Sequence, residues 1–152
     1  MSHATGVCID DNSRVAFTQI KPDEKKRSAT AFLKASIAYY TKLGVKVEPV
    51  MTDNGFCYRS RDFARVCENS GLRHIRTKPC TPKTNGKAER FIQTALREWA
   101  YAHVYNTSDQ RAAELPIWMH RYNWHRLHGS IGAKPPVSRL GLTRNNLLRL
   151  HS

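Results

Sequence analysis

Apolar and polar residues alternate in the first part of the chain, and turn residues interrupt the alternation. Residues 7–9 are apolar and are followed at 10–13 by Asp-Asp-Asn-Ser, beyond which residues 15–20 alternate again. Two such segments on either side of a turn are typical of a β-hairpin. We therefore expect strands over about 6–10 and 15–20.

Apolar positions spaced three and four residues apart then predict four helices. The expected spans are about 26–43, 60–69, 86–103 and 108–124. Gly44 ends the first helix, and Ser108 is the expected N-cap of the last. Three aromatic residues lie at helical spacing and are expected in the core: Trp99, Trp118 and Trp124.

Two short strands are expected between these helices, over about 45–52 and 73–76. Pro49 lies inside the first of them and has no amide hydrogen to give to a sheet. The order is then hairpin, helix, strand, helix, strand, helix, helix. This order predicts an α/β layered domain in which helices pack on a central sheet.

The charge of the chain is strongly positive and unevenly distributed. The 152 residues include 25 Lys and Arg against 12 Asp and Glu, which gives a net charge of +13. Residues 71–97 hold seven basic residues and a single acid, and no acid follows Glu114. A field of this sign favours polyanionic partners, above all nucleic acid.

The composition argues against several other classes of protein. No apolar run approaches the roughly 18 residues of a membrane span, and the N-terminus has no signal-peptide pattern. We therefore expect a cytoplasmic protein without a membrane partner. The four cysteines form no C-x-x-C pair, which argues against a zinc ribbon. His125 and His128 have no cysteine nearby and are expected to serve a surface or core role.

Two carboxylates stand out against the basic background. Asp53 follows a predicted strand, where open α/β sheets place their active sites. Glu89 lies in the first turn of a predicted helix, and 35 residues separate the two. Two metal ions held by carboxylates can stabilise the attacking and leaving oxygens of a phosphodiester. Both residues also have ordinary explanations, since Asp is common in turns and Glu is favoured at helix starts.

Two segments resemble signature motifs of the DDE transposase and retroviral-integrase superfamily. They are Met-Thr-Asp-Asn-Gly at 51–55 and Thr-Pro-Lys-Thr-Asn-Gly-Lys-Ala-Glu-Arg-Phe at 81–91. The second has the form found in bacterial insertion sequences, and the spacing of 35 residues is characteristic of the superfamily. Further matches extend the resemblance to the family's second strand and to the end of its core, at 9–14, 122–128 and 135–136.

The resemblance implies a ribonuclease H-like fold, with a mixed sheet and flanking helices. It implies cleavage and joining of DNA strands with Mg²⁺ or Mn²⁺, where water and then a DNA 3′-hydroxyl are the nucleophiles. The expected partners are transposon ends, target DNA and further copies of the chain. Matched residue by residue, Asp53 is the second catalytic and metal-binding carboxylate and Glu89 is the third.

The residues expected to contact DNA lie on both sides of Glu89. Their side chains can neutralise phosphates or donate hydrogen bonds to them. For Asn85 the alternative is capping of the helix that follows. The set is Lys78, Lys83, Asn85, Lys87, Arg90 and Gln93.

The beginning of the chain departs from the family pattern. The family's first Asp lies on a strand that precedes the hairpin, whereas the hairpin here begins almost at Met1. We therefore expect a sheet without that first strand, and little strand transfer by these residues alone. Asp10 or Asp11 is the alternative first carboxylate, although their Asn-Ser-Arg context matches the turn after the family's second strand.

Three functions are compatible with the sequence. The chain is a DNA strand-transferase core, a catalytically inactive transposase fragment that binds DNA, or a basic RNA-binding protein without catalysis. For the transposase core, residues 1–128 are expected to form the catalytic core without its first strand, and residues 129–152 a C-terminal extension.

Overall fold

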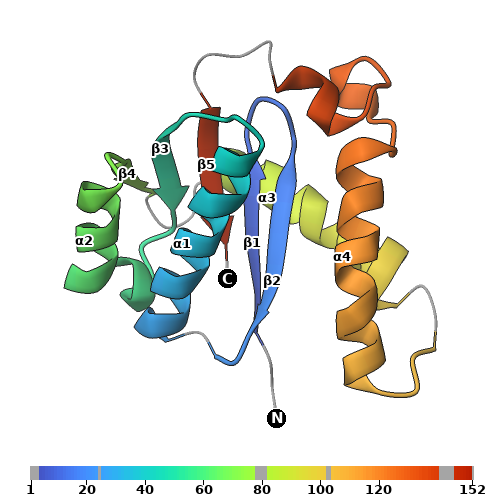
Figure 1. Cartoon of the computed structure of the whole chain (residues 1–152), viewed down its shortest axis with the longest axis horizontal. Coiled ribbons are helices and arrows are strands. Elements are labelled where there is room, and N and C mark those ends of the chain that lie inside the picture. Colours follow the sequence, from blue (N-terminus) through green and yellow to red (C-terminus); the bar gives the residue numbers. More distant parts are fainter. Residues whose placement is uncertain (1–3, 24, 78–81, 102–103, 141–145, 152) are drawn as a thin grey trace.

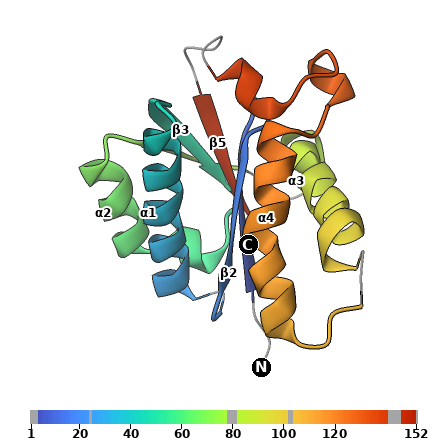
Figure 2. The same cartoon turned by 45° about the vertical axis from the view of Figure 1, so that its right-hand side comes forward.

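A five-stranded mixed sheet separates two layers of helices in the computed structural model, which describes residues 4–23, 25–77, 82–101, 104–140 and 146–151. The strands in chain order are β1 (Ala4–Asp10), β2 (Ala16–Lys21), β3 (Val47–Thr52), β4 (Arg73–Arg76) and β5 (Asn146–His151). Their order in the sheet is β2-β1-β5-β3-β4. Figures 1 and 2 show one helical pair on each face: α1 (Lys26–Lys42) with α2 (Arg61–Asn69), and α3 (Pro82–Ala95) with α4 (Ser108–Trp124). The expected α/β layered architecture is confirmed.

The N-terminal hairpin forms where the sequence predicts it. β1 and β2 pair antiparallel, with Ile9 opposite Ala16. The buried carboxylate of Asp10 closes the turn, because it accepts hydrogen bonds from the hydroxyl and the amide of Ser13 at 2.6 and 3.4 Å. Asp10 therefore serves the turn as a local acceptor, as Asp commonly does at such positions.

The first hydrophobic core lies between the sheet and the α1–α2 layer. Phe32, Leu33 and Tyr40 of α1 pack there with Phe63 of α2, and all four are almost fully buried. Ser60 caps α2 by accepting a hydrogen bond from the amide of Phe63 at 3.1 Å. The apolar stripe predicted for the first helix is thus the face that α1 buries.

β3 carries the irregularity that its proline predicts. β3 and β4 are parallel, with Thr52 opposite Arg76. On its other side β3 pairs with β5, and the register shifts between Val47 and Val50, around Pro49. A proline has no amide hydrogen for a neighbouring strand, so a local break in pairing is its direct consequence.

The second hydrophobic core lies between the sheet and the α3–α4 layer. Val7 of β1, Phe91 of α3 and Trp118 of α4 are buried in it. Trp99 is also buried there, in the π-helical turn η2 (Leu96–Ala100) that continues α3. The prediction of a core position is confirmed for Trp99 and Trp118 and wrong for Trp124, which is 44% exposed.

Two helix starts differ from the sequence-based prediction. α3 begins at Pro82, earlier than expected, because proline suits the first turn of a helix, whose amides have no helical acceptor. Asn85 is therefore inside the helix, and its prediction as a cap is wrong. α4 is capped by Thr107 rather than by Ser108, because the Thr107 hydroxyl accepts from the amide of Gln110 at 3.2 Å.

The central strand of the sheet, β5, is an element that the sequence analysis does not predict. It is antiparallel to β1, with Arg149 opposite Ile9, and parallel to β3, with Arg149 opposite Met51. Leu148 is fully buried in the first core. Arg149 Nε donates to Asp11 Oδ1 at 2.6 Å, which ties β5 to the hairpin. The two halves of the sheet, β1–β2 and β3–β4, are thus joined through β5.

The thiols and the helices show no sign of a disulfide scaffold or of a membrane segment in the part of the chain that the structure describes. Cys8, Cys57 and Cys67 are free thiols. Burial raises the pKa of the Cys8 thiol to about 12, so this group stays protonated and acts as a core side chain.

None of the described helices combines the length and the apolar character that a membrane span requires. Cys80 lies outside the described residues.

Candidate active site

Asp53 lies just beyond the carboxyl end of β3, with its side chain exposed. Its Oδ1 accepts a hydrogen bond from the amide of Gly55 at 2.7 Å. A Cβ on residue 55 would lie only 2.9 Å from the same oxygen. A side chain at position 55 would therefore shift the Asp53 carboxylate from this orientation. The exposed carboxylate keeps lone pairs for a cation.

The backbone next to Asp53 is held by partly buried hydrogen bonds. Thr52 Oγ1 donates to the carbonyl oxygen of Asp53 at 2.8 Å and lies 2.7 Å from Nε2 of His74. The carbonyl oxygen of Thr52 accepts from the amide of Thr77 at 2.8 Å. Burial, with a smaller contribution from the charge of Arg76, lowers the pKa of His74, so its ring is neutral near pH 7.

The position of Glu89 on α3 and the alternation along β3 bear on which face of the sheet each carboxylate occupies. Glu89 is exposed on α3, two residues before Phe91, which is buried against β1 in the second core. Neighbouring residues of a strand point to opposite faces. Val50 packs in the first core, beyond the register shift of β3. Met51 therefore points to the opposite face of the sheet, and Asp53, just past the end of the strand, follows Met51 by two residues.

The register of the sheet shows which residue of β1 lies at the same height along the sheet as the end of β3. Val7 lies opposite His151 of β5, and Arg149 of β5 lies opposite Met51 of β3. Asp53 follows Met51 by two residues, as His151 follows Arg149. The end of β3 is therefore at the level of Val7, which belongs to the same core as Phe91 of α3.

The two carboxylates offer hard oxygen donors of the kind that Mg²⁺ and Mn²⁺ prefer. Mg²⁺ is commonly held by one or two protein carboxylates and completes its shell with water. Within the described ranges, no three or more Asp, Glu, His or Cys side chains gather closely enough to hold a metal ion. A metal ion at this edge would therefore have few ligands among the described residues.

The structure separates Asp10 and Asp11 from Asp53. Asp10 and Val50 both lie opposite Leu148, so Asp10 is level with a residue three positions before Asp53. The offset is roughly 10 Å along the sheet and roughly 10 Å across it. Burial raises the pKa of Asp10, whose carboxylate already serves the hairpin turn. Asp10 and the adjacent Asp11 are therefore poorly placed to share a cation with Asp53.

The side chains predicted to contact DNA fall into three groups. Lys78 lies outside the described residues. Lys83, Asn85 and Lys87 belong to the first two turns of α3 by their backbone positions. Arg90 and Gln93 follow Glu89 on the same helix, and both are exposed.

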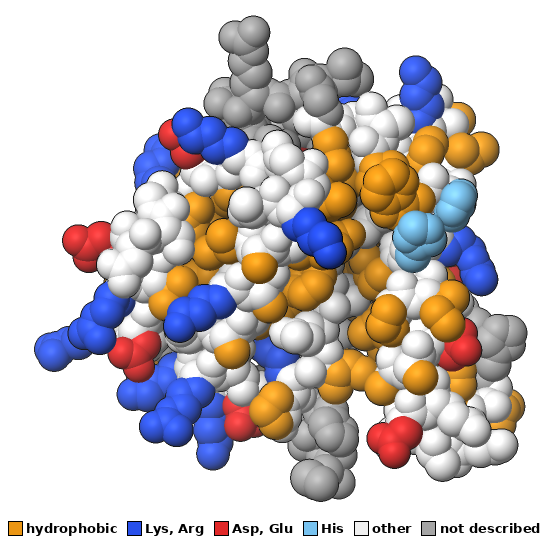
Figure 3. All heavy atoms as spheres, viewed as in Figure 1, with side chains coloured by type: hydrophobic (Ala, Val, Ile, Leu, Met, Phe, Trp, Pro, Cys, Tyr) orange, Lys and Arg blue, Asp and Glu red, His pale blue; other side chains and the backbone are white. Residues whose placement is uncertain are grey.

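A second basic surface lies outside the set of residues predicted to contact DNA. Figure 3 shows Lys and Arg side chains gathered over the start of α1 and over α2. The segment η1 (Phe56–Tyr58), which follows Asp53, packs against α1. Phe56 is 90% exposed, with the Arg59 guanidinium 5.8 Å from its ring centre. We call this the α1–α2 basic surface, and its exposed cations are Lys25, Lys26, Arg27, Arg59, Arg61 and Arg65.

Similarity to known sequences covers much of the chain. Residues 70–136 match the integrase core domain family. The chain is 36% identical over 90 residues to the retrovirus-related Pol polyprotein from transposon TNT 1-94 of Nicotiana tabacum, covering 59% of this chain and 7% of that protein. It is 30% identical over 107 residues to the putative transposase InsD for insertion element IS2E of Escherichia coli, covering 66% and 49%. The chain thus spans about half the length, or less, of these relatives.

Similarity to solved structures covers nearly all of the chain. The catalytic core domain of BIV integrase aligns with a TM-score of 0.71 and 21% identity, over 92% of this chain and 86% of that one. The simian T-cell lymphotropic virus intasome, in complex with a PP2A regulatory subunit, aligns with a TM-score of 0.73 and 21% identity, over 93% and 49%. The HTLV-2 integrase catalytic core in complex with magnesium, described as a dimeric form, gives 0.62 and 20%, over 88% and 81%. At these identities the likeness concerns the fold.

Proposed function

The chain belongs to the DDE transposase and retroviral-integrase superfamily, and on this premise we propose that it is the part of an insertion-sequence transposase core that carries Asp53 and Glu89. Its substrate is DNA, and its reaction class is metal-dependent strand cleavage and transfer. The observation that supports the proposal is the register of the sheet. It makes the end of β3 level with Val7 of β1, which belongs to the same core as Phe91 of α3.

Asp53 and Glu89 are the residues that would hold a divalent cation, Mg²⁺ or Mn²⁺. The HTLV-2 integrase core, which shares the fold, is described with magnesium. Such a cation polarises a phosphoryl oxygen and lowers the pKa of bound water. The protein's own contribution is to hold the Asp53 carboxylate through the amide of Gly55 and to keep Glu89 exposed on α3.

The proposed DNA path has two arms that flank Asp53. One arm follows α3 and includes Arg90 and Gln93 beside Glu89. The other is the α1–α2 basic surface, which adjoins the segment after Asp53 through η1. Cations on both sides of the carboxylates would hold phosphates close to a site that otherwise repels them.

The experiment that tests this function is a nicking and joining assay on supercoiled plasmid with a labelled transposon-end oligonucleotide. Nicking that needs Mg²⁺ or Mn²⁺ and stops with EDTA supports a strand transferase. DNA binding without metal-dependent nicking supports the inactive fragment, and tighter binding to RNA than to DNA supports an RNA-binding protein.

The alternative, a DNA-binding fragment without catalysis, is favoured by one specific observation. The strand between β1 and β3 is β5, and its sequence, Asn-Leu-Leu-Arg-Leu-His, contains no carboxylate. In the family this chain resembles, the first Asp lies on a strand before the hairpin. Two carboxylates bring less negative charge to a pair of cations than three, so we propose that joining by this chain alone is weak.

DNA affinity is expected to depend steeply on salt, and the α1–α2 basic surface should contribute to that dependence. Replacing Arg59 and Arg61 by alanine should lower the log–log salt slope by about 0.9 for each phosphate contact that is lost. The control replaces two exposed lysines at the other end of this layer: Lys42, the last residue of α1, and Lys46, which lies between α1 and β3. Fluorescence anisotropy with duplex DNA over a salt series measures both slopes. Equal slopes for the two double variants would contradict a role for this surface in DNA binding.

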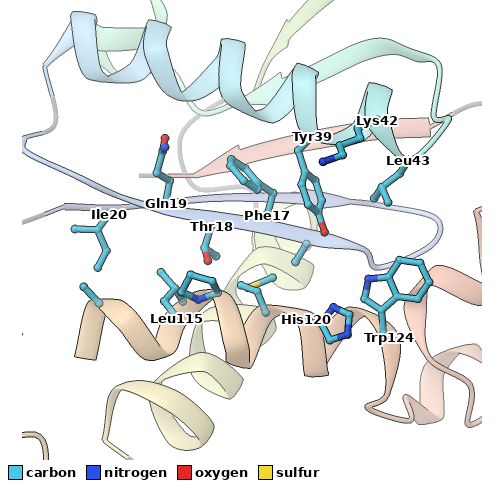
Figure 4. Close-up of a pocket in the computed structure, with 14 residues that line it drawn as sticks. Phe17, Thr18, Gln19, Ile20, Tyr39, Lys42, Leu43, Leu115, His120 and Trp124 are labelled. Atoms are coloured by element: carbon cyan, nitrogen blue, oxygen red, sulfur yellow. The ribbon is translucent and has the colours of Figure 1, made fainter. Parts of the chain in front are cut away.

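We propose further that the chain associates with itself through a hollow between α1, β2 and α4 (Figure 4). The walls are largely apolar and include Phe17, Tyr39, Leu115 and Trp124. β2 is one of the two edge strands of the sheet, and its outer edge pairs with no strand in the part of the chain that the structure describes. Exposed apolar surface beside an open strand edge is typical of protein contacts, and the HTLV-2 core of the same fold is described as dimeric.

Replacing Trp124 by aspartate is expected to shift the chain toward the monomer, because a charge would be buried in the contact. The control is Ile117→Asp, since Ile117 is 53% exposed on the same helix and does not line the hollow. Light scattering coupled to gel filtration measures the mass of each variant. A wild-type chain that is monomeric at all concentrations, or equal effects of the two variants, would reject this surface.

A further inference from the structure

His74 and Thr52 form a partly buried contact that leads to Asp53. Thr52 is the last residue of β3 and is only 2% exposed. Its Oγ1 donates to the carbonyl oxygen of Asp53 at 2.8 Å and lies 2.7 Å from Nε2 of His74. The two side chains are brought together by the parallel pairing of β3 with β4.

The direction of these hydrogen bonds follows from the number of protons. A threonine hydroxyl has one proton, and the carbonyl oxygen of Asp53 can only accept. The hydroxyl of Thr52 therefore gives its proton to Asp53 and must accept one from His74. A hydrogen bond at 2.7 Å then requires that Nε2 of His74 carries a hydrogen.

The ring of His74 is itself held in place by the first core. Its centroid lies 4.9 Å from that of Phe63, which is fully buried and in turn packs edge-on against Tyr58 at 5.4 Å. An aromatic contact of this kind restricts the ring more than a solvent-exposed position would. The donor at Nε2 is thus fixed relative to β3.

We propose that His74 is a positioning residue that fixes Asp53 through Thr52. The relay His74 Nε2–H to Thr52 Oγ1–H to the Asp53 carbonyl oxygen holds the backbone of the turn, while Gly55 holds the carboxylate. The carboxylate then keeps one orientation before a cation arrives. The consequence for metal binding rests on the proposed function, whereas the relay itself does not.

The relay can be tested without metal, by NMR of the imidazole nitrogens of the whole chain. Near pH 7 the expected result is a neutral His74 ring with its proton on Nε2. A neutral ring with its proton on Nδ1 would overturn the proposal. A second measurement is hydrogen exchange at the amide of Gly55, which should become at least a few-fold faster in His74→Phe and in Thr52→Val.

Metal affinity tests the positioning role. His74→Phe keeps an aromatic ring beside Phe63 but removes the donor, and Thr52→Val removes the hydroxyl at nearly constant volume. Each is expected to weaken Mn²⁺ binding by about 10-fold, as loss of an outer-shell partner does, and the double variant should be no weaker than either single one, because both break the same relay. His74→Gln and Thr52→Ser keep the hydrogen-bonding groups and should restore most of the affinity.

The two kinds of failure are distinguishable. If His74→Phe and Thr52→Val lower the melting temperature but leave both the Gly55 exchange and the Mn²⁺ affinity of the folded chain unchanged, the pair is merely structural and the proposal is wrong. If the wild-type chain does not bind Mn²⁺, the proposed function fails, and the tautomer and the exchange at Gly55 still decide the relay.

Discussion

Replacing Asp53 by asparagine is expected to weaken Mn²⁺ binding by about 100-fold or more. Loss of an outer-shell partner already costs about 10- to 100-fold in affinity, and Asp53 is proposed as a direct ligand. Asparagine keeps an oxygen that can accept from the amide of Gly55, so the turn should survive and only the negative charge is lost. Isothermal titration calorimetry with Mn²⁺ measures the effect.

Glu89→Gln is the companion variant and should act in the same direction, since it also removes one charge and keeps the shape of the side chain. The matched controls are Asp62→Asn and Glu68→Gln, which change exposed carboxylates of α2. Where the chain nicks DNA, Asp53→Asn and Glu89→Gln should reduce nicking to the level measured in EDTA, while the α2 variants should not. Full metal affinity in either site variant would remove that residue from the proposed site.

The parts of the fold that the sequence predicts are those governed by local periodicity. The hairpin, α1 and α2 follow from alternation, from helical spacing and from turn residues, all of which act over a few neighbouring residues. β5 is different, because Leu148 and Leu150 are its buried positions but Leu147 interrupts the alternation. Its place in the middle of the sheet depends on pairing with β1, far away in sequence, and no local pattern encodes that pairing.

The same distinction holds for the candidate site. Asp53 and Glu89 are found from the sequence because a turn, a helix start and a family motif mark them. The contact between Thr52 and His74 is not found, since 22 positions separate the two residues and only the register of β3 with β4 brings them together. The α1–α2 basic surface is missed for a related reason. Its cations come from two separate segments, which form one surface only when α1 and α2 pack side by side.

Leu148→Asp is expected to abolish stable folding, or to lower the free energy of unfolding by about 4 kcal/mol or more. Leu148 lies in the first core, and 0% of its surface is exposed to solvent. Truncating a buried leucine alone costs about 2–5 kcal/mol, and burying a carboxylate adds a desolvation cost. Domains have only about 5–15 kcal/mol of stability in total.

The position of β5 makes this effect larger than the loss of one core contact. β1 and β3 both pair with β5 and not with each other, so disruption of β5 leaves two smaller sheets, each with an open edge. The control is Leu127→Asp, which makes the same chemical change at a leucine that is 62% exposed. Urea unfolding followed by circular dichroism compares the variants. If Leu148→Asp unfolds within about 1 kcal/mol of the wild-type chain, the size of a typical tolerated substitution, then β5 does not join the two halves of the sheet in solution.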